Sequence, residues 1–257
     1  MLLCSDFDMT MGKGGVVTPD NCDAIRYFQE NGGRFTIISG RHPIYLKEHQ
    51  NGFRVNAPLV GYNGALILDE NTGEILYSGG SMDHRALDLA EQLWNEDGRL
   101  WRVVMHCELS DHVICYRTPK ENGVLTIAEL RERCILPLYN VLCCGLTPED
   151  TADLKDRLTE LAQGHFEIAR SWDTGVEIIC PNDSKGGAAQ RLKQMLGARL
   201  LVTVGDYEND ISMLRSGDIS YAVENALPHV KAAAKRETVH YTQSAIAAIV
   251  ADLEKEL

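Results

Sequence analysis

Short apolar runs alternate with amphipathic stretches in the first and last parts of the chain. The runs have the length and residue types of buried strands, while the stretches between them repeat apolar residues three or four positions apart, as helices do. One helix is predicted to start at Thr18-Pro19, because threonine caps free backbone N–H groups and proline suits the first helical position. This alternation predicts a parallel sheet with helices on both faces. After the apolar start of the chain, the predicted strands cover residues 35–38, 59–62, 200–204 and 220–223.

The pattern changes near Gly79-Gly80-Ser81, after a predicted hairpin over residues 66–77. Further helix and strand signals follow, and their order is typical of a separate α+β module. From Asn182 the alternation returns, and helices predicted at residues 228–234 and 244–256 close the chain. We therefore predict an α/β fold whose doubly wound parallel-sheet (Rossmann-like) core covers residues 1–81 and 182–257, with an inserted α+β module at residues 82–181.

The composition limits the partners of the protein. Its net charge of −12 over 257 residues disfavours nucleic acid and acidic membranes, because their phosphates would be repelled. No apolar run approaches the ~18 residues of a membrane helix, and the N-terminus does not have a signal-peptide pattern, so we expect a cytoplasmic protein. The eight cysteines form no Cys-x-x-Cys pair and are expected to be reduced. The oligomeric state cannot be predicted from these features.

A zinc site in the middle of the chain is disfavoured. The spacing of His106, Cys107, His112 and Cys115 matches no tight zinc-ligand pattern. These residues are better explained as incidental core and loop positions.

Polar clusters follow the predicted strands at the ends where parallel sheets bind their ligands. Asp6 and Asp8 come directly after the first strand, and side chains two positions apart on a strand point the same way. Two neighbouring acids suit separate tasks, one ionised to bind metal or attack and one protonated to donate. The other clusters are Ser39-Gly40-Arg41, Asn63-Gly64-Ala65, Lys185-Gly186-Gly187 at a helix start, and Gly205-Asp206 with Asn209-Asp210.

Four of these motifs, in this order, resemble those of the haloacid dehalogenase-like superfamily of phosphohydrolases. The closer likeness is to its Cof-type branch, in which a large α/β cap is inserted between the second and third motifs. The resemblance covers nearly the whole chain, and it implies a Mg²⁺-dependent phosphatase, a phosphoric monoester hydrolase, acting on a small phosphorylated metabolite such as a sugar phosphate. The motifs are Asp6-x-Asp8-x-Thr10, Ser39-Gly40-Arg41, Lys185-Gly186-Gly187 and Gly205-Asp206-x-x-Asn209-Asp210.

The resemblance also implies a role for each motif residue. Asp6 would attack phosphorus and form an aspartyl-phosphate, while Asp8 would protonate the leaving oxygen and then deprotonate water. Ser39 and Lys185 would hold the phosphate oxygens. Mg²⁺, which prefers hard oxygen ligands, would be held by the Asp6 carboxylate, the Asp8 carbonyl and Asp206.

The remaining motif residues are implied to support this chemistry. Asp210 would act as an indirect or water-bridged metal ligand, Asn209 would orient its loop, and Thr10 would hydrogen-bond near the nucleophile. Asn63-Gly64 resembles a segment that lines the substrate cleft, although it is also typical of a tight turn. Phosphate or substrate contacts are expected from Thr10, Ser39, Gly40, Arg41, Asn63, Lys185 and Asn209.

Each motif taken alone has a simpler structural explanation. Lys185 is explained as a solvated lysine, Ser39-Gly40 as a turn, and Asn209-Asp210 as a helix cap. Glu177, which precedes the third motif, is explained equally well as a solvent-facing strand residue. The common order and strand-end placement of all four motifs favour the phosphatase interpretation.

One position departs from the family pattern. Met9 stands where glycine is usual, and it predicts a conventional backbone geometry there, with an apolar group near the entrance that narrows substrate choice or impairs turnover. Two alternative functions stay open. One is a phosphotransferase or phosphomutase on the same fold, and the other is a catalytically weakened metabolite-binding protein, to which Met9 lends slight support.

Overall fold

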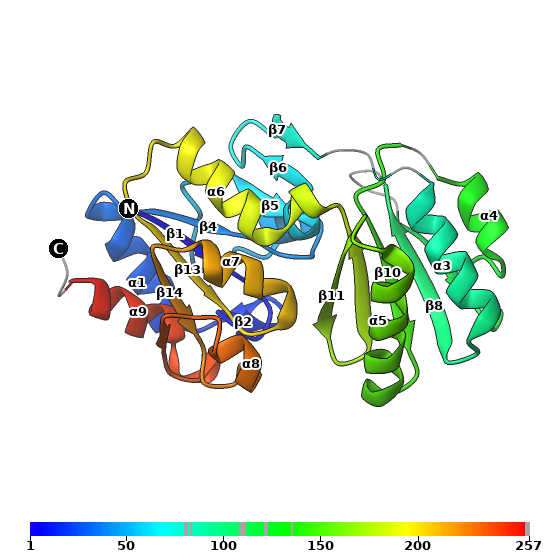
Figure 1. Cartoon of the computed structure of the whole chain (residues 1–257). Coiled ribbons are helices and arrows are strands. Elements are labelled where there is room, and N and C mark those ends of the chain that lie inside the picture. The colour runs from blue at the N-terminus through cyan, green and yellow to red at the C-terminus, as the bar shows by residue number, and fades with distance from the viewer. Residues whose placement is uncertain (80–81, 83, 108–111, 121–122, 135, 255–257) are drawn as a thin grey trace. The chain divides into compact units, whose positions relative to one another are not determined.

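The computed structural model describes residues 1–79, 82, 84–107, 112–120, 123–134 and 136–254. The chain divides into two compact units, which are drawn in Figure 1. Unit 1 combines Met1–Ser78 with Lys185–Leu257, and unit 2 is Gly79–Ser184. Among the residues described, none of the helices has both the length and the apolar character that crossing a bilayer requires.

The central sheet of unit 1 contains five described strands, all parallel, in the order β15-β14-β13-β1-β4. The first strand lies in the interior of this sheet, where Leu2 is in register with both Leu201 and Arg34. Distant parts of the sequence therefore become neighbours at this sheet. The strands are β1 (Leu2–Ser5), β4 (Arg34–Ile37), β13 (Leu201–Gly205), β14 (Ile219–Ala222) and β15 (Arg236–Glu237).

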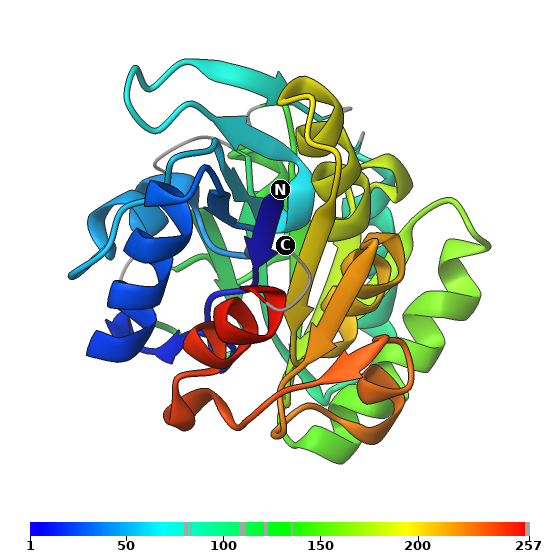
Figure 2. The ribbon, with the colours of Figure 1, turned by 90° about the vertical axis from the view of Figure 1, so that its left-hand side faces the viewer.

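Helices cover both faces of the central sheet, as predicted. Successive side chains of β1 point to opposite faces, so Leu3 packs into the core beneath α1 and α9, while Leu2 and Cys4 pack against α6. α1 and α9 lie side by side (Figure 2). The predicted cap at the start of α1 is present, because the Thr18 hydroxyl accepts a hydrogen bond from the N–H of Asn21. The helices are α1 (Pro19–Glu30), α6 (Lys185–Met195), α7 (Ile211–Ser216) and α9 (Ala245–Leu253).

The smaller elements of unit 1 differ in part from the predictions. The predicted hairpin is present and pairs with a third strand to form an antiparallel sheet, in the order β5-β6-β7. The helix predicted at residues 228–234 is shorter, because α8 ends at Lys231. A short helix, α2, and the hairpin of β2 and β3 were not predicted. These elements are β2 (Gly12–Lys13), β3 (Val16–Val17), α2 (Pro43–Glu48), β5 (Leu59–Gly61), β6 (Leu66–Leu68), β7 (Ile75–Ser78) and α8 (Pro228–Lys231).

Unit 2 has its own hydrophobic core on one face of an antiparallel sheet, in the order β11-β12-β10-β8-β9. Val141 and Cys143 of β10 point into this core and pack with the apolar faces of the helices. The Thr147 hydroxyl caps the N–H of Asp150 at the start of α5. The elements are α3 (Arg85–Glu96), β8 (Leu100–His106), β9 (His112–Tyr116), α4 (Ile127–Glu132), β10 (Asn140–Gly145), α5 (Pro148–Ala162), β11 (Glu167–Trp172) and β12 (Gly175–Ile179).

Glu177 of β12 is buried, with 4% of its surface exposed, so the explanation as a solvent-facing residue is wrong. The Asn140 amide donates to its Oε2 at 2.8 Å, and the Ser171 hydroxyl donates to Oε1. These bonds replace the water that the carboxylate loses on burial.

Candidate functional site

The polar clusters found in the sequence lie at the carboxyl ends of the strands of unit 1. Asp6 follows β1, Ser39 lies just beyond β4, and Asp206 follows β13. Backbone hydrogen bonds continue past the strands and align these ends, since the N–H of Asp6 donates to the Val204 carbonyl at 3.0 Å. The N–H of Ser39 likewise donates to the Val60 carbonyl at 3.0 Å. The parallel sheet therefore brings these clusters to a single edge.

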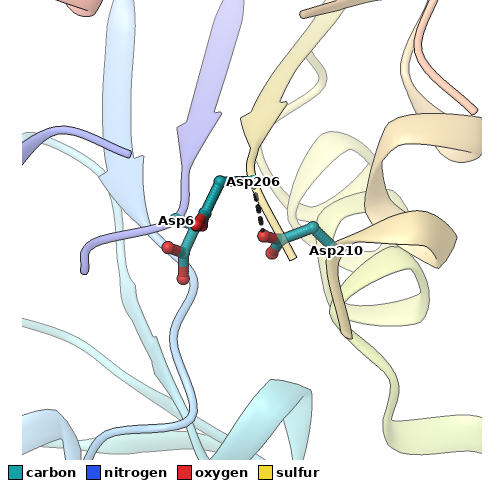
Figure 3. Close-up of side chains that lie close together, drawn as sticks. All are labelled: Asp6, Asp206 and Asp210. Carbon is teal, nitrogen blue, oxygen red and sulfur yellow. Dashed lines mark hydrogen bonds between the residues drawn. The ribbon is translucent and has the colours of Figure 1, made fainter. Parts of the chain in front are cut away.

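Three carboxylates converge at this edge (Figure 3). One oxygen from each of Asp6, Asp206 and Asp210 lies within 4.8 Å of the other two, and all three side chains are buried. Carboxylate oxygens are the ligands that hard divalent cations prefer. No other group of three or more His, Cys, Asp or Glu residues in the described part of the chain has this geometry.

Lys185, the first residue of α6, is 1% exposed, so its explanation as a solvated lysine is wrong. Its Nζ lies 2.6 Å from Oδ1 of Asp6 and 2.7 Å from Oδ1 of Asp210. Burial and the start of a helix both disfavour a cation, and the two carboxylates offset these costs. Burial lowers the pKa of Lys185. The negative charges of Asp210 and Asp6 raise it by more than burial lowers it, so the net shift is upward and the ammonium stays charged.

One ammonium does not balance three buried carboxylates. Burial, followed by repulsion from Asp6 and Asp210, raises the pKa of Asp206 to about 8. Burial also raises the pKa of Asp6 to about 7, with Lys185 opposing the rise and Asp210 adding to it. A divalent cation would supply the missing positive charge and favour the ionised acids. The donor set and its charge therefore fit a hard divalent metal ion.

Two motif glycines make room for this arrangement. A Cβ at Gly205 would lie 2.5 Å from the carboxyl carbon of Asp210. A Cβ at Gly186 would lie 2.4 Å from the carbonyl oxygen of Ser212, where α6 approaches α7. A larger residue at either position would displace Asp210 or move the start of α6, and with it Lys185.

Asp210 orients both the loop after β13 and Lys185. Its Oδ2 accepts the N–H groups of Asp206 at 2.9 Å and Tyr207 at 3.1 Å, while its Oδ1 meets Lys185. Thr10 donates its hydroxyl to Oδ1 of Asp206 at 3.0 Å. Thr10 was expected to hydrogen-bond near the predicted nucleophile, Asp6. In the structure its partner is the neighbouring acid Asp206.

Asn63 and Asn209 contact each other, which the sequence analysis did not foresee. The Asn209 amide donates to Oδ1 of Asn63 at 3.0 Å. Asn63 is 1% exposed, and its N–H donates to the Ser39 carbonyl at 2.9 Å. This contact ties the loop after β5 to the loop after β13, and no sequence signal links residues that lie 146 positions apart.

Asp8 does not join the three carboxylates, because Arg41 holds it. Nε of Arg41 donates to Oδ2 of Asp8 at 2.8 Å, and Nη2 donates to Oδ1 at 3.2 Å. The Ser39 hydroxyl accepts the N–H of Arg41 at 3.2 Å, with Gly40 between them. Within the described residues, no hydrogen bond joins Ser39 to the three carboxylates.

Comparison with known proteins agrees with this geometry. A family model described as haloacid dehalogenase-like hydrolase matches residues 3–250. The chain belongs to the haloacid dehalogenase-like hydrolase family. The predicted family and the prediction of a hydrolase are thus confirmed.

Relatives of this hydrolase include named phosphatases of similar length. The pyridoxal phosphate phosphatase YbhA of Escherichia coli is 24% identical over 234 residues, covering 84% of each chain. Phosphoglycolate phosphatase 2 of Saccharolobus solfataricus is 23% identical over 236 residues, covering 90% of this chain and 82% of its own. The structure of BT4131, a HAD subclass IIB sugar phosphatase, covers 98% of both chains with a TM-score of 0.79 at 17% identity. These findings confirm the fold class and the enzyme class, a phosphatase.

Met9 contradicts the prediction of a conventional backbone. Its φ is 63°, which lies in the left-handed region that favours glycine, so the backbone adopts a glycine-like turn with a side chain in place. Two contacts hold the strained residue, because its N–H donates to the Gly12 carbonyl at 2.6 Å and its carbonyl accepts the Asn225 amide at 2.9 Å.

Met9→Gly is expected to stabilise the protein relative to Met9→Ala by about 1 kcal/mol. A left-handed residue with a Cβ costs roughly 1–2 kcal/mol, part of which the flexibility of glycine in the unfolded chain cancels. The measurement is the urea midpoint of each variant, with Met9→Ala as the control for loss of the side chain. A Met9→Gly variant less stable than Met9→Ala would show that the turn is not strained.

Proposed function

We propose that this hydrolase is a Mg²⁺-dependent phosphatase that acts on a small phosphorylated metabolite, such as a sugar phosphate, through an aspartyl-phosphate on Asp6. The observation that carries this proposal is the convergence of Asp6, Asp206 and Asp210, with the Lys185 ammonium bound to Asp6 and Asp210. Phosphoryl transfer needs a placed nucleophile and neutralisation of charge, and these side chains supply both. The names of the relatives support a small phosphorylated substrate.

Asp6 is placed for attack on phosphorus. Lys185 holds its Oδ1, and among the described residues no hydrogen bond is made to its Oδ2, which is left for attack. As the new bond forms between Asp6 and phosphorus, the ester bond breaks and Asp8 gives its proton to the leaving oxygen. Water then attacks phosphorus, Asp8 takes a proton from it, and the bond to Asp6 breaks to release phosphate. Lys185 and the Ser39 hydroxyl would bind the phosphate oxygens.

The metal would be held by the carboxylates of Asp6 and Asp206 and the carbonyl oxygen of Asp8. When bound, Mg²⁺ would neutralise the phosphoryl oxygens and the surplus negative charge of the acids. Asp210 supports this set indirectly, because both of its oxygens are engaged by Lys185 and by backbone N–H groups.

We propose that unit 2 serves as the cap of the enzyme. It is inserted in the chain between Ser78 and Lys185, and it folds around a hydrophobic core of its own. Its last residue directly precedes Lys185, which belongs to the site. Such an insertion can differ between relatives without disturbing the core sheet.

Removal of divalent metal is expected to abolish phosphate release, and added Mg²⁺ is expected to restore it. The measurement is hydrolysis of p-nitrophenyl phosphate and of a panel of sugar phosphates, by protein treated with a chelator, dialysed and then titrated with Mg²⁺. Asp206→Asn serves as the matched variant and should need a higher Mg²⁺ concentration for half-maximal rate. Full activity of the dialysed protein in chelator would contradict the proposed metal dependence.

A further inference from the structure

The ion pair between Arg41 and Asp8 joins two residues for which separate roles were predicted. Arg41 was expected to bind substrate, and Asp8 to move protons. In the structure two parallel N–H···O hydrogen bonds connect the guanidinium with both oxygens of Asp8, with donor–acceptor distances of 2.8 and 3.2 Å. This two-point geometry fixes the direction of a carboxylate better than a single contact does.

Arg41 is itself held on three sides. Its N–H donates to the Ser39 hydroxyl at 3.2 Å, and its carbonyl accepts the N–H of Tyr62 at 3.2 Å. Its guanidinium lies over the ring of Tyr45, 4.7 Å from the ring centre, and Tyr45 stacks on His49 with centroids 3.7 Å apart. A cation over an aromatic face is attracted by the ring. The side chain of Arg41 therefore has a support that is independent of Asp8.

We propose that Arg41 is a positioning residue, which acts on the reaction by holding the carboxylate of Asp8 and is itself held by the ring of Tyr45. This inference rests on the proposed function, because it requires Asp8 to be the acid and base of phosphate ester hydrolysis. It replaces the expectation that Arg41 binds the substrate directly. Since the guanidinium faces both oxygens of Asp8, its effect passes through that carboxylate.

The leaving group separates these two roles. An alkyl phosphate has a poor leaving group, so breaking its ester bond depends on the proton that Asp8 delivers to the leaving oxygen. p-Nitrophenolate leaves readily without that proton. In the first step, transfer of the phosphoryl group to Asp6, a residue that positions Asp8 therefore matters for the alkyl ester and much less for the aryl ester, whereas the later attack of water needs Asp8 for both. A residue that binds the phosphate matters equally for both.

The experiment compares Arg41→Met with the unchanged protein on 2-phosphoglycerol and on p-nitrophenyl phosphate. In the first turnover, at saturating substrate, we expect the rate of alcohol release from the alkyl ester to fall by about 10- to 100-fold, with KM little changed, and the rate of p-nitrophenol release to fall less than about 3-fold. Tyr45→Ala should lower the rate with the alkyl ester by a smaller factor and again leave the aryl ester nearly unaffected. Tyr45→Phe should hydrolyse the alkyl ester at the unchanged rate, because it keeps the aromatic ring under the guanidinium. Arg26→Met, which removes an exposed arginine paired with Asp23, is the matched control and should leave both rates unchanged.

A double-mutant cycle with Asp8→Asn completes the test. In that background Arg41→Met should change neither the first release of p-nitrophenol nor inhibition by orthophosphate, because its effect passes through Asp8. Equal losses on both esters, or weaker orthophosphate inhibition in both backgrounds, would overturn the proposal and show direct phosphate binding. The side chains of Arg41 and Asp8 are 46% and 33% exposed, so the fold should persist in each variant, as circular dichroism would verify.

Failure of this inference is distinguishable from failure of the proposed function. If the unchanged protein hydrolyses neither ester, or if Asp6→Asn retains the activity, the proposed function itself is wrong. If the unchanged protein and Asp6→Asn behave as expected and Arg41→Met has no selectivity for the alkyl ester, only the positioning role is wrong.

Discussion

Asp6→Asn is expected to lower phosphate release from p-nitrophenyl phosphate by at least about 10⁴-fold while the protein remains folded. The amide has nearly the shape of the carboxylate but cannot form the phosphoryl-enzyme. Lys185 would keep its contact with Asp210, at 2.7 Å, so the ammonium would not lose all of its partners. Because burial raises the pKa of Asp6 to about 7, a neutral side chain at this position should not weaken the fold at pH 8.

The measurement combines steady-state rates with acid-quenched mass spectrometry of the enzyme during turnover. The unchanged protein should carry a phosphoryl group on Asp6, and the variant should carry none. Asp23→Asn, at an exposed position of α1, is the matched control and should keep both the rate and the phosphoryl group. Turnover of Asp6→Asn at the unchanged rate would exclude Asp6 as the nucleophile.

Lys185→Met is expected to have the second-largest effect, on both activity and stability. The ammonium is the only side-chain cation that pairs with Asp6 and Asp210 among the described residues. Its removal leaves buried carboxylates without a partner, which costs about 3 kcal/mol or more at pH 8. Phosphate release should fall to background, because the phosphate oxygens lose a cation as well.

The loss of stability in Lys185→Met should depend on pH. The pKa of Asp6 is raised to about 7 in the folded protein, above the ~3.9 of an unfolded chain, so the folded state holds the proton more tightly. The protonated Asp6 carboxyl therefore contributes to the free energy of unfolding. This contribution is fully present below about pH 4 and is lost as the pH rises through about 7. Without Lys185 the pKa of Asp6 should rise further. The loss of unfolding free energy in Lys185→Met, relative to the unchanged protein, should therefore be larger at pH 8 than at pH 5.

Lys193→Met is the matched control for Lys185→Met, because Lys193 lies on the same helix. Its pair with Asp218, at 2.7 Å, is partly exposed, and such pairs contribute at most about 1 kcal/mol. Chelator-treated protein unfolded in urea at pH 5 and pH 8 gives the comparison. Equal losses for the two lysine variants at pH 8 would contradict the account of Lys185 as a buried counter-charge.

Much of the fold could be predicted because local signals agreed with the final structure. Thr18-Pro19 begins α1 and Thr147-Pro148 begins α5, since capping depends only on neighbouring residues. Short elements were harder to predict. α2, at Pro43–Glu48, has little apolar periodicity, and the helix predicted at 228–234 ends at Lys231. Such short segments take their shape from tertiary contacts more than from their own sequence.

For the candidate site, the sequence indicated which acids lie close together but not which contacts they make. Strand-end placement pointed to Asp6 and Asp206, whose carboxylates share one cluster. The pairing of Arg41 with Asp8 could not be predicted, because the partner of a side chain depends on how two loops meet. Met9 was misjudged for a different reason. Its hydrogen bonds to Gly12 and Asn225 hold a strained backbone that residue preferences alone disfavour.

We propose that distant residues of this chain form one site for a divalent cation beside the Asp6 carboxylate. The most direct test is X-ray diffraction from crystals grown with Mn²⁺ in place of Mg²⁺, recorded at a wavelength where manganese scatters anomalously. We expect one anomalous peak about 2.1 Å from carboxylate oxygens of both Asp6 and Asp206. The proposal is wrong if the manganese peak lies elsewhere in the molecule. It is also wrong if no peak lies beside these two carboxylates at saturating Mn²⁺.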